Sequence, residues 1–187
     1  MAASRPASDV VAAARLVVVV MGVSGTGKST VAEGIASALG LRCIDGDHLH
    51  SAASVAKMSR GVALGDEDRW PWLDRVGAAL ADAQASPAGM VVSCSALRRV
   101  YRDRLRAACP GLRFLFLDGD AELIGARLRQ RAGHYMPASL FDSQLHSLER
   151  PDSDEHDVLR ADVSVAADQV IAHAVAALRR GGTAPAA

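Results

Sequence analysis

The chain has 187 residues, half of them apolar and 22% charged, which predicts one globular domain with a sizeable core. Lysine and arginine together equal aspartate and glutamate in number, so no basic excess points to a nucleic-acid partner. No apolar run approaches the roughly 20 residues that span a bilayer, and three cysteines without metal-ligand spacing favour a reduced, cytoplasmic protein in which they are small buried apolar residues.

The first element expected along the chain is a strand at residues 16–21. It follows a lead-in over residues 1–14, which lacks the apolar core of a signal peptide and is expected to be flexible. The strand is apolar and β-branched, as buried parallel strands are. It runs into GVSGTGKS, which matches the phosphate-binding pattern G-x-x-x-x-G-K-[ST], and a helix is expected at residues 29–39. Strand, loop and helix together predict a site for a nucleoside triphosphate.

Each residue type in this loop has a physical reason. Glycines let successive backbone N–H groups turn inward around a phosphate, and the helix N-terminus adds partial positive charge. Lys28 can reach the outer phosphates, and Ser29 can offer its hydroxyl to Mg²⁺. Nucleotide binding is therefore assigned to one continuous stretch: Gly22, Val23, Ser24, Gly25, Thr26, Gly27, Lys28, Ser29 and Thr30.

Strands and helices alternate along the rest of the chain. Further strands are expected at residues 41–45, 90–95, 112–118 and 157–165, and further helices at residues 66–85, 97–108, 122–131, 140–148 and 166–180. This order predicts a three-layer α/β/α fold with a mainly parallel five-stranded sheet, in which ligands bind at the carboxyl ends of the strands. No linker or repeat interrupts the pattern, so we expect a single domain over residues 15–180 and a flexible tail at residues 181–187.

Two aspartates follow the second expected strand, in the sequence IDGDHLH. Asp45 and Asp47 stand where that strand opens on the predicted cleft. A carboxylate there can support Mg²⁺ through water or accept a proton from an attacking hydroxyl; the alternative is a polar turn that caps the next helix. A second D-G-D, at Asp118 to Asp120, is interpreted as a helix cap at Asp120, and a Mg²⁺-linked role for Asp118 stays open.

Arginines near the end of two further segments are candidates for anionic ligands. Arg98 follows the third expected strand, at the rim of the cleft. Arg127 and Arg131 lie one helical turn apart, ahead of Gly133. This spacing predicts a mobile lid over about residues 127–138, in which one arginine stacks on adenine and the other neutralises the transferred phosphoryl group. A basic helix in water is the alternative.

Five segments in this order resemble gluconokinase of the small P-loop type: GVSGTGKST, DGDHLH, KMSRGVALGDEDRWPWL, CSALRRVYRDRLR and GHYMP. The resemblance covers roughly residues 16–180. It implies a P-loop kinase that transfers the γ-phosphoryl group of ATP to D-gluconate and gives 6-phospho-D-gluconate. It also implies Mg²⁺ and a homodimer.

The resemblance implies a role for most of the polar residues named above. Lys28, Asp47 and Arg131 form the catalytic set, Arg127 contacts the nucleotide, and Ser29 with Asp45 supports Mg²⁺. The roles of the two aspartates could be exchanged. The acid end of gluconate calls for cations, and the residues expected to contact gluconate are Asp47, His50, Lys57, Arg69, Arg98 and His134.

Two other functions stay open at this point. The first is another small-metabolite kinase, which would act on shikimate or a different sugar acid. The second is a nucleotide-binding module or switch that is not an enzyme. The chain contains no asparagine, so the N-K-x-D element of a guanine-specific switch is absent.

Overall fold

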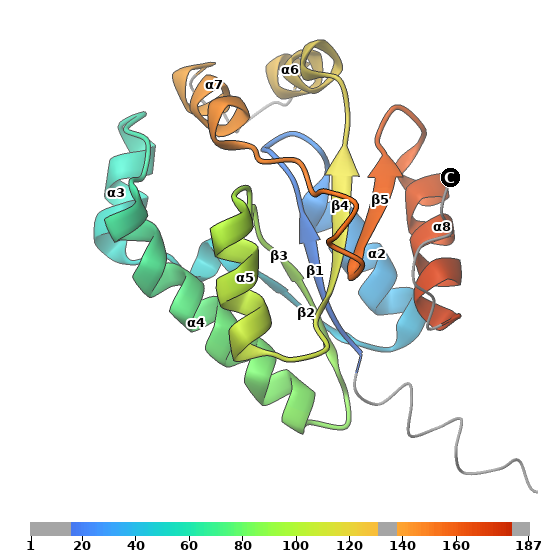
Figure 1. Cartoon of the computed structure of the whole chain (residues 1–187). Helices are drawn as coiled ribbons and strands as arrows, with labels where there is room; N and C mark the ends of the chain where they lie inside the picture. Colours follow the sequence, from blue (N-terminus) through green and yellow to red (C-terminus); the bar gives the residue numbers. More distant parts are fainter. Residues whose placement is uncertain (1–15, 131–137, 181–187) are drawn as a thin grey trace, which may run out of the picture.

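The structure, a computed structural model, describes residues 16–130 and 138–180 (Figure 1). Its strands form one parallel sheet in the order β2-β3-β1-β4-β5. They are Val17–Met21 (β1), Arg42–Asp45 (β2), Met90–Ser93 (β3), Arg113–Asp118 (β4) and Val158–Asp162 (β5). The predicted five-stranded parallel sheet is confirmed, with shorter third and fifth strands than expected.

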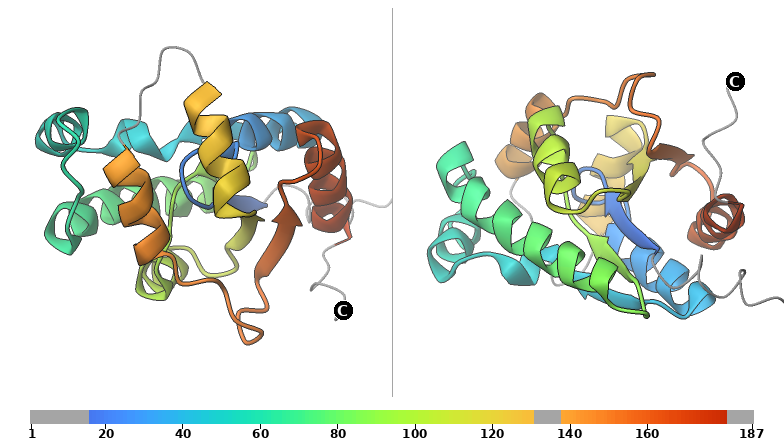
Figure 2. Two further views of the ribbon diagram at one scale, coloured as in Figure 1. Left: turned by 90° about the horizontal axis from the view of Figure 1, so that it is seen from above. Right: turned by 60° about the horizontal axis from the view of Figure 1, so that its bottom comes forward.

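The helices are Lys28–Leu39 (α2), Ala52–Ser59 (α3), Asp66–Ala85 (α4), Arg99–Ala108 (α5), Ala121–Gln130 (α6), Ala138–Ser147 (α7) and Ala167–Arg179 (α8), together with a 3₁₀ helix at Gly46–Leu49 (η1). The sequence did not predict η1 and α3, because four and eight residues are too few to show a clear helical period. In Figures 1 and 2, α6 and α7 lie over the carboxyl end of the sheet.

The alternation of side chains along β1 explains its apolar sequence. Val17, Val19 and Met21 face one core, which α4 and α5 cover. Val18 and Val20 face the other core, which α2 and α8 cover. All five side chains are buried, because a central parallel strand has helices on both of its faces. The three-layer α/β/α prediction is confirmed.

A buried ion pair joins α5 to the segment before β5. Arg102 donates to both carboxylate oxygens of Glu155, over 2.7 and 2.6 Å, and both side chains are 1% exposed. Hydrogen bonds from Arg102 and Arg106 lower the pKa of Glu155 to about 2, although burial opposes this shift. Arg102 also donates to the backbone oxygen of Glu149 over 3.0 Å. The pair therefore fixes the return of the chain from α7 against α5.

Two smaller predictions have different outcomes. Asp120 accepts a hydrogen bond from the Glu122 N–H over 2.7 Å at the start of α6, so its role as a helix cap is confirmed. Cys94 and Cys109 are buried, but Cys43 is exposed, and the prediction was wrong for that residue. Cys43 lies in β2, which is an edge strand of the sheet.

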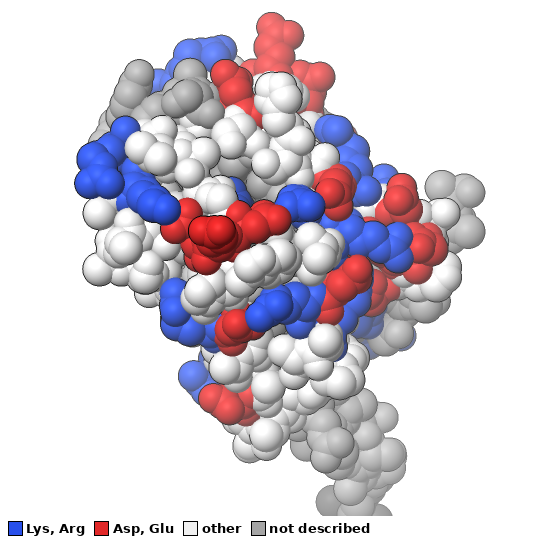
Figure 3. Space-filling model, turned by 60° about the vertical axis from the view of Figure 1, so that its left-hand side comes forward, with Lys and Arg blue, Asp and Glu red and all other residues white. Residues whose placement is uncertain are grey.

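The surface carries mixed charge. On the side of the molecule that bears α3 and α4, basic and acidic residues are interspersed, and neither sign covers the face (Figure 3). Within the described part of the chain, every helix is too short or too polar to cross a bilayer.

Candidate active site

The predicted phosphate-binding loop joins the central strand β1 to α2. Gly25 and Gly27 have φ angles of 87° and 91°, in the left-handed region that favours glycine. A Cβ at Gly25 would also lie 2.7 Å from the Leu128 side chain of α6, so the loop packs closely beneath that helix. Lys28 begins α2, and its Nζ donates to the Val23 carbonyl over 3.1 Å. The loop has the strand, turn and helix context that phosphate binding requires.

Asp45 lies at the end of β2, next to this loop. Its Oδ2 accepts from the Ser29 hydroxyl over 3.0 Å, and its Oδ1 accepts from the Asp47 N–H over 3.0 Å. Burial would raise the pKa of Asp45, but hydrogen bonds from the Asp47 N–H and from the Ser93 and Ser29 hydroxyls outweigh it and lower that pKa. The carboxylate therefore stays charged, caps η1, and presents oxygen beside the Ser29 hydroxyl. Two adjacent oxygens of this kind fit Mg²⁺, which usually takes few protein ligands and keeps water and phosphate oxygens.

A cavity of about 270 Å³ lies beside the loop. This volume is small even for a site that binds a metabolite. Five predicted residues line it: Ser24, Lys28, Asp47, His50 and Arg69. The other lining residues come from α3, the segment before α4, α4 itself, the segment after β3, and α7: Met58, Ala63, Leu64, Trp72, Ser95, Leu140, Ser143 and Gln144. The structure thus brings the phosphate-binding lysine, a carboxylate and an arginine to one cavity.

Asp47 and His50 lie close together but differ strongly in solvent exposure. The Asp47 side chain is 68% exposed, whereas that of His50 is 5% exposed, and their nearest charged atoms are 4.0 Å apart. The His50 ring stacks on Trp72 with ring centroids 4.3 Å apart, and Trp72 Nε1 donates to the Gly46 carbonyl over 2.7 Å. Burial lowers the pKa of His50, with the Arg69 and Arg75 charges adding to that effect. A buried, stacked histidine therefore lies beside an accessible carboxylate.

The three cations expected to meet an acidic substrate are held differently. Lys57 Nζ donates to both oxygens of Asp68, over 2.7 and 2.9 Å, and Arg98 Nη1 donates to both oxygens of Asp66, over 2.7 and 3.0 Å. Arg69 donates through Nε to the Leu64 carbonyl over 3.2 Å. Of the three cations, Arg69 alone lines the cavity; Lys57 and Arg98 do not.

The predicted lid is described only in part. Arg127 lies in α6 and is half-buried. Arg131 and His134 lie outside the described residues. The lid, the role of Arg131 in catalysis and the contact of His134 with substrate stay predictions.

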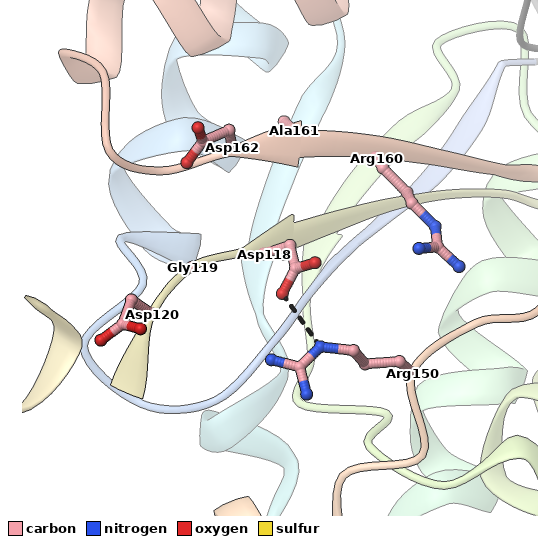
Figure 4. A pocket seen from close by; sticks show the side chains of 7 residues that line it. All are labelled: Asp118, Gly119, Asp120, Arg150, Arg160, Ala161 and Asp162. Atoms are coloured by element: carbon pink, nitrogen blue, oxygen red, sulfur yellow. Dashed lines mark hydrogen bonds and ion pairs between the residues drawn. The ribbon is translucent and has the colours of Figure 1, made fainter. Parts of the chain in front are cut away.

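A second depression lies at the carboxyl ends of β4 and β5 (Figure 4). It has a volume of about 420 Å³ and is lined by Asp118, Gly119, Asp120, Arg150, Arg160, Ala161 and Asp162. Asp118 points toward Arg150 and accepts from its Nε over 3.3 Å. Asp118 is thus engaged in an ion pair here, and it does not line the cavity that holds Lys28 and Asp47.

Sequence reasoning missed two features of the site. Ala96 is fully buried and has a φ of 41°, which is a strained backbone angle for a residue with a Cβ. The residue before it, Ser95, accepts a hydrogen bond at its carbonyl from the Gly22 N–H of the loop over 3.3 Å. Gln144, in α7, accepts a hydrogen bond from the Ser24 N–H over 2.7 Å. An alanine carries no sign of its φ angle, and a glutamine 120 residues from the loop matches no local motif.

Comparison with known proteins agrees with this geometry. A family model described as AAA domain matches residues 17–151. The chain is 47% identical to the thermosensitive gluconokinase of Escherichia coli over 78% of each chain, and 48% identical to a gluconokinase of Gluconobacter oxydans over 73% of this chain and 77% of that protein. The crystal structure of a gluconokinase from Sinorhizobium meliloti superposes with a TM-score of 0.80 at 45% identity, covering 89% of this chain and 93% of that one. With this identity and a P-loop kinase fold, the chain belongs to the gluconokinase family.

Proposed function

We propose that this protein is an ATP-dependent gluconokinase, which transfers the γ-phosphoryl group of ATP to the terminal hydroxyl of D-gluconate and yields 6-phospho-D-gluconate. The observation that carries the proposal is the cavity shared by Lys28, Asp47 and Arg69. It places a phosphate-binding cation, an accessible carboxylate and an arginine around one small space. The cation suits the phosphates of ATP, the carboxylate suits the primary hydroxyl of the acceptor, and the arginine suits its acid group. The names of the relatives support the choice of gluconate.

Each of the three groups has one task in this reaction. Lys28 neutralises charge on the outer phosphates as the phosphoryl group leaves. Asp47 accepts the proton of the attacking hydroxyl, and its exposure lets it turn toward that hydroxyl. Arg69 binds the carboxylate of gluconate, since a guanidinium pairs well with a carboxylate. Positioning and charge neutralisation supply most of the catalysis in phosphoryl transfer.

Ser29 and Asp45 are the residues that would hold Mg²⁺. Their oxygens lie 3.0 Å apart, and the lowered pKa of Asp45 keeps its carboxylate charged. Mg²⁺ held by these two residues would supply positive charge that neutralises the phosphates. Because Asp45 already accepts hydrogen bonds from the Ser29 hydroxyl and the Asp47 N–H, it is less suited than Asp47 to take a proton from the acceptor. This favours one assignment of the two aspartates, with Asp47 as the base.

The cellular setting belongs to the same proposal. We infer a cytoplasmic homodimer that acts on a small molecule and has no nucleic-acid or membrane partner. The balanced formal charge supports the absence of a nucleic-acid partner. The homodimer rests on the family resemblance, and light scattering on the purified protein tests it directly.

A substrate panel tests the reaction. ADP release should be measured by a coupled assay with gluconate, gluconolactone, shikimate and AMP as acceptors. Gluconate should be turned over far faster than the other three, because only an open-chain sugar acid offers both the carboxylate and the primary hydroxyl. Turnover of shikimate equal to that of gluconate would favour another small-metabolite kinase. ADP release that no acceptor stimulates would favour a nucleotide-binding module.

A further inference from the structure

One contact links the phosphate-binding loop to a helix that the loop motif does not include. The Ser24 N–H donates to Oε1 of Gln144 over 2.7 Å, across 120 residues of sequence. The facing atom of the carboxamide must be its oxygen, because a backbone N–H can only donate. Both residues line the cavity of the proposed reaction.

The Ser24 N–H belongs to the set of loop amides that bind phosphate in proteins with this motif. A carboxamide oxygen that accepts from such an amide occupies the place of a phosphate oxygen. The Lys28 ammonium is likewise turned to a loop carbonyl, that of Val23, over 3.1 Å. Two donors at the loop, the Ser24 N–H and the Lys28 ammonium, are therefore satisfied by protein oxygens, one of which comes from α7.

The same helix forms part of the wall around the acceptor. Leu140, Ser143 and Gln144 of α7 line the cavity together with Asp47 and Arg69. Gln144 is half-buried, and its carboxamide lies between the loop and the cavity. Displacement of Gln144 from Ser24 therefore changes the wall of the acceptor cavity.

We propose that Gln144 is a positioning residue that couples nucleotide binding to the acceptor cavity. Before nucleotide binds, its oxygen holds the Ser24 N–H. When a phosphate oxygen takes that donor, the carboxamide is released and its N–H₂ group, which has two donors, turns toward the transferring phosphoryl group and the acceptor. This inference rests on the proposed function for its second half only; the competition between Gln144 and phosphate requires no particular acceptor.

Two substitutions at Gln144 separate this proposal from a packing role. Gln144→Leu removes the competing oxygen, so ATP should bind about 2- to 10-fold more tightly, as loss of one competing hydrogen bond predicts. Gln144→Glu keeps the oxygen and adds negative charge beside the phosphates, so ATP should bind at least about 10-fold more weakly. Both dissociation constants are measured by calorimetry without any acceptor. His146→Gln, an exposed residue of the same helix, is the matched control and should bind ATP normally.

Turnover is the second readout. Gln144→Leu should lower kcat at saturating ATP and gluconate, although ATP binds more tightly, because the released carboxamide is missing. Shifts of ATP affinity in the same direction for the two variants, or no shift in either, would overturn the competition, and a normal kcat in Gln144→Leu would overturn the positioning role. Gln144→Met replaces the leucine variant if circular dichroism shows that the latter is unfolded. If the unaltered protein fails to phosphorylate gluconate, the proposed function falls, while the ATP affinities still decide the role of Gln144.

Discussion

The cations around the acceptor cavity differ from one another in what neutralises them. Lys57 and Arg98 each donate twice to a carboxylate, with shortest distances of 2.7 Å, and neither lines the cavity. Arg69 lines the cavity and donates to a carbonyl, and its guanidinium lies 5.7 Å from the centre of the Tyr101 ring. Among the described residues Arg69 forms no ion pair, and the carboxylates of Asp66 and Asp68 act on its charge only from a longer distance. An acidic substrate can use that charge, whereas it would have to displace a carboxylate at the other two.

The paired cations have a structural task instead. Arg98 and the Tyr101 hydroxyl both hydrogen bond to Asp66 at the start of α4, and Arg98 also reaches Glu149 over 3.4 Å. The hydrogen bond from Tyr101 and that from Arg98 lower the pKa of Asp66. These contacts join α4, α5 and the segment after α7, so Arg98 helps to hold the cavity wall in place. Substitutions can test this division between a cation that binds substrate and cations that stabilise the wall of the cavity.

The largest effect is expected at the nucleotide side of the cavity. Lys28→Ala should lower kcat by roughly 10³-fold or more, because it removes the cation on the outer phosphates. The matched control is Lys57→Ala, which removes the other lysine of the chain, one already paired with Asp68. Its loss of turnover should be far smaller. Equal losses of turnover in the two variants, measured by ADP release, would mean that Lys28 contributes no more to phosphoryl transfer than Lys57, and would contradict the account.

Substitution of each of the two aspartates by asparagine tests which of them is the base. Asp47→Asn should bind ATP normally and lose turnover by roughly 10²- to 10⁴-fold, since asparagine keeps the size and cannot accept the proton. Asp45→Asn should instead raise the Mg²⁺ concentration needed for half-maximal activity. A mild effect at Asp47 with a severe loss at Asp45 that excess Mg²⁺ does not restore would exchange the two roles.

The comparison of Arg69 with Arg98 is tested by the KM for gluconate. Arg69→Ala should raise this KM by about 10- to 100-fold and leave the KM for ATP nearly unchanged, as loss of one charge-assisted hydrogen bond predicts. Arg98→Ala should change the KM for gluconate much less and lower the unfolding temperature. The account of the cations fails if Arg98→Ala has the larger effect on the gluconate KM.

The smallest effect concerns the buried His50. Burial lowers its pKa in the folded protein, and the facing charges of Arg69 and Arg75 add to this, while Asp47 and Asp68 oppose it. The unfolded chain, with an ordinary histidine pKa of about 6.5, then takes up a proton before the folded protein does. Stability present above that value should therefore fall as the pH drops through it.

His50→Phe isolates that contribution. Phenylalanine keeps the stacking on Trp72 and has no proton to gain. Thermal unfolding of the two proteins should be compared between pH 7.5 and pH 5.5, where the variant should lose a few degrees less than the unaltered chain. Parallel curves would mean that His50 is not buried as a neutral ring.

Local sequence patterns predicted most of the nucleotide side of the site and much less of the acceptor side. The loop at residues 22–29 and Asp45 lie at strand ends, where the order of strands and helices alone predicts their place. The pairing of Arg98 with Asp66 joins residues 32 apart, and that of Lys57 with Asp68 joins the unpredicted α3 to α4. Such pairings depend on how helices pack, so the sequence alone could not distinguish the three cations. The structure shows that Lys57 and Arg98 are paired with carboxylates and that Arg69 lines the cavity.

Residues of the α7 wall were missed for the same reason. Gln144 and Ser143 were seen only as members of an expected helix, because the face that a helix turns to a cavity depends on its docking. Ala96 was missed because its positive φ follows from the close approach of the segment after β3 to the loop, where the Ser95 carbonyl meets the Gly22 N–H. The residue types involved do not indicate backbone contacts of this kind.

The most direct test of the account measures both products of the same reaction. Purified protein should be incubated with ATP, Mg²⁺ and D-gluconate, with ADP and 6-phospho-D-gluconate quantified in parallel by separate coupled assays. The account predicts equal amounts of the two products and no ADP above background when gluconate is omitted. ADP formed without 6-phospho-D-gluconate, or at the same rate in the absence of gluconate, would contradict phosphoryl transfer to this acceptor.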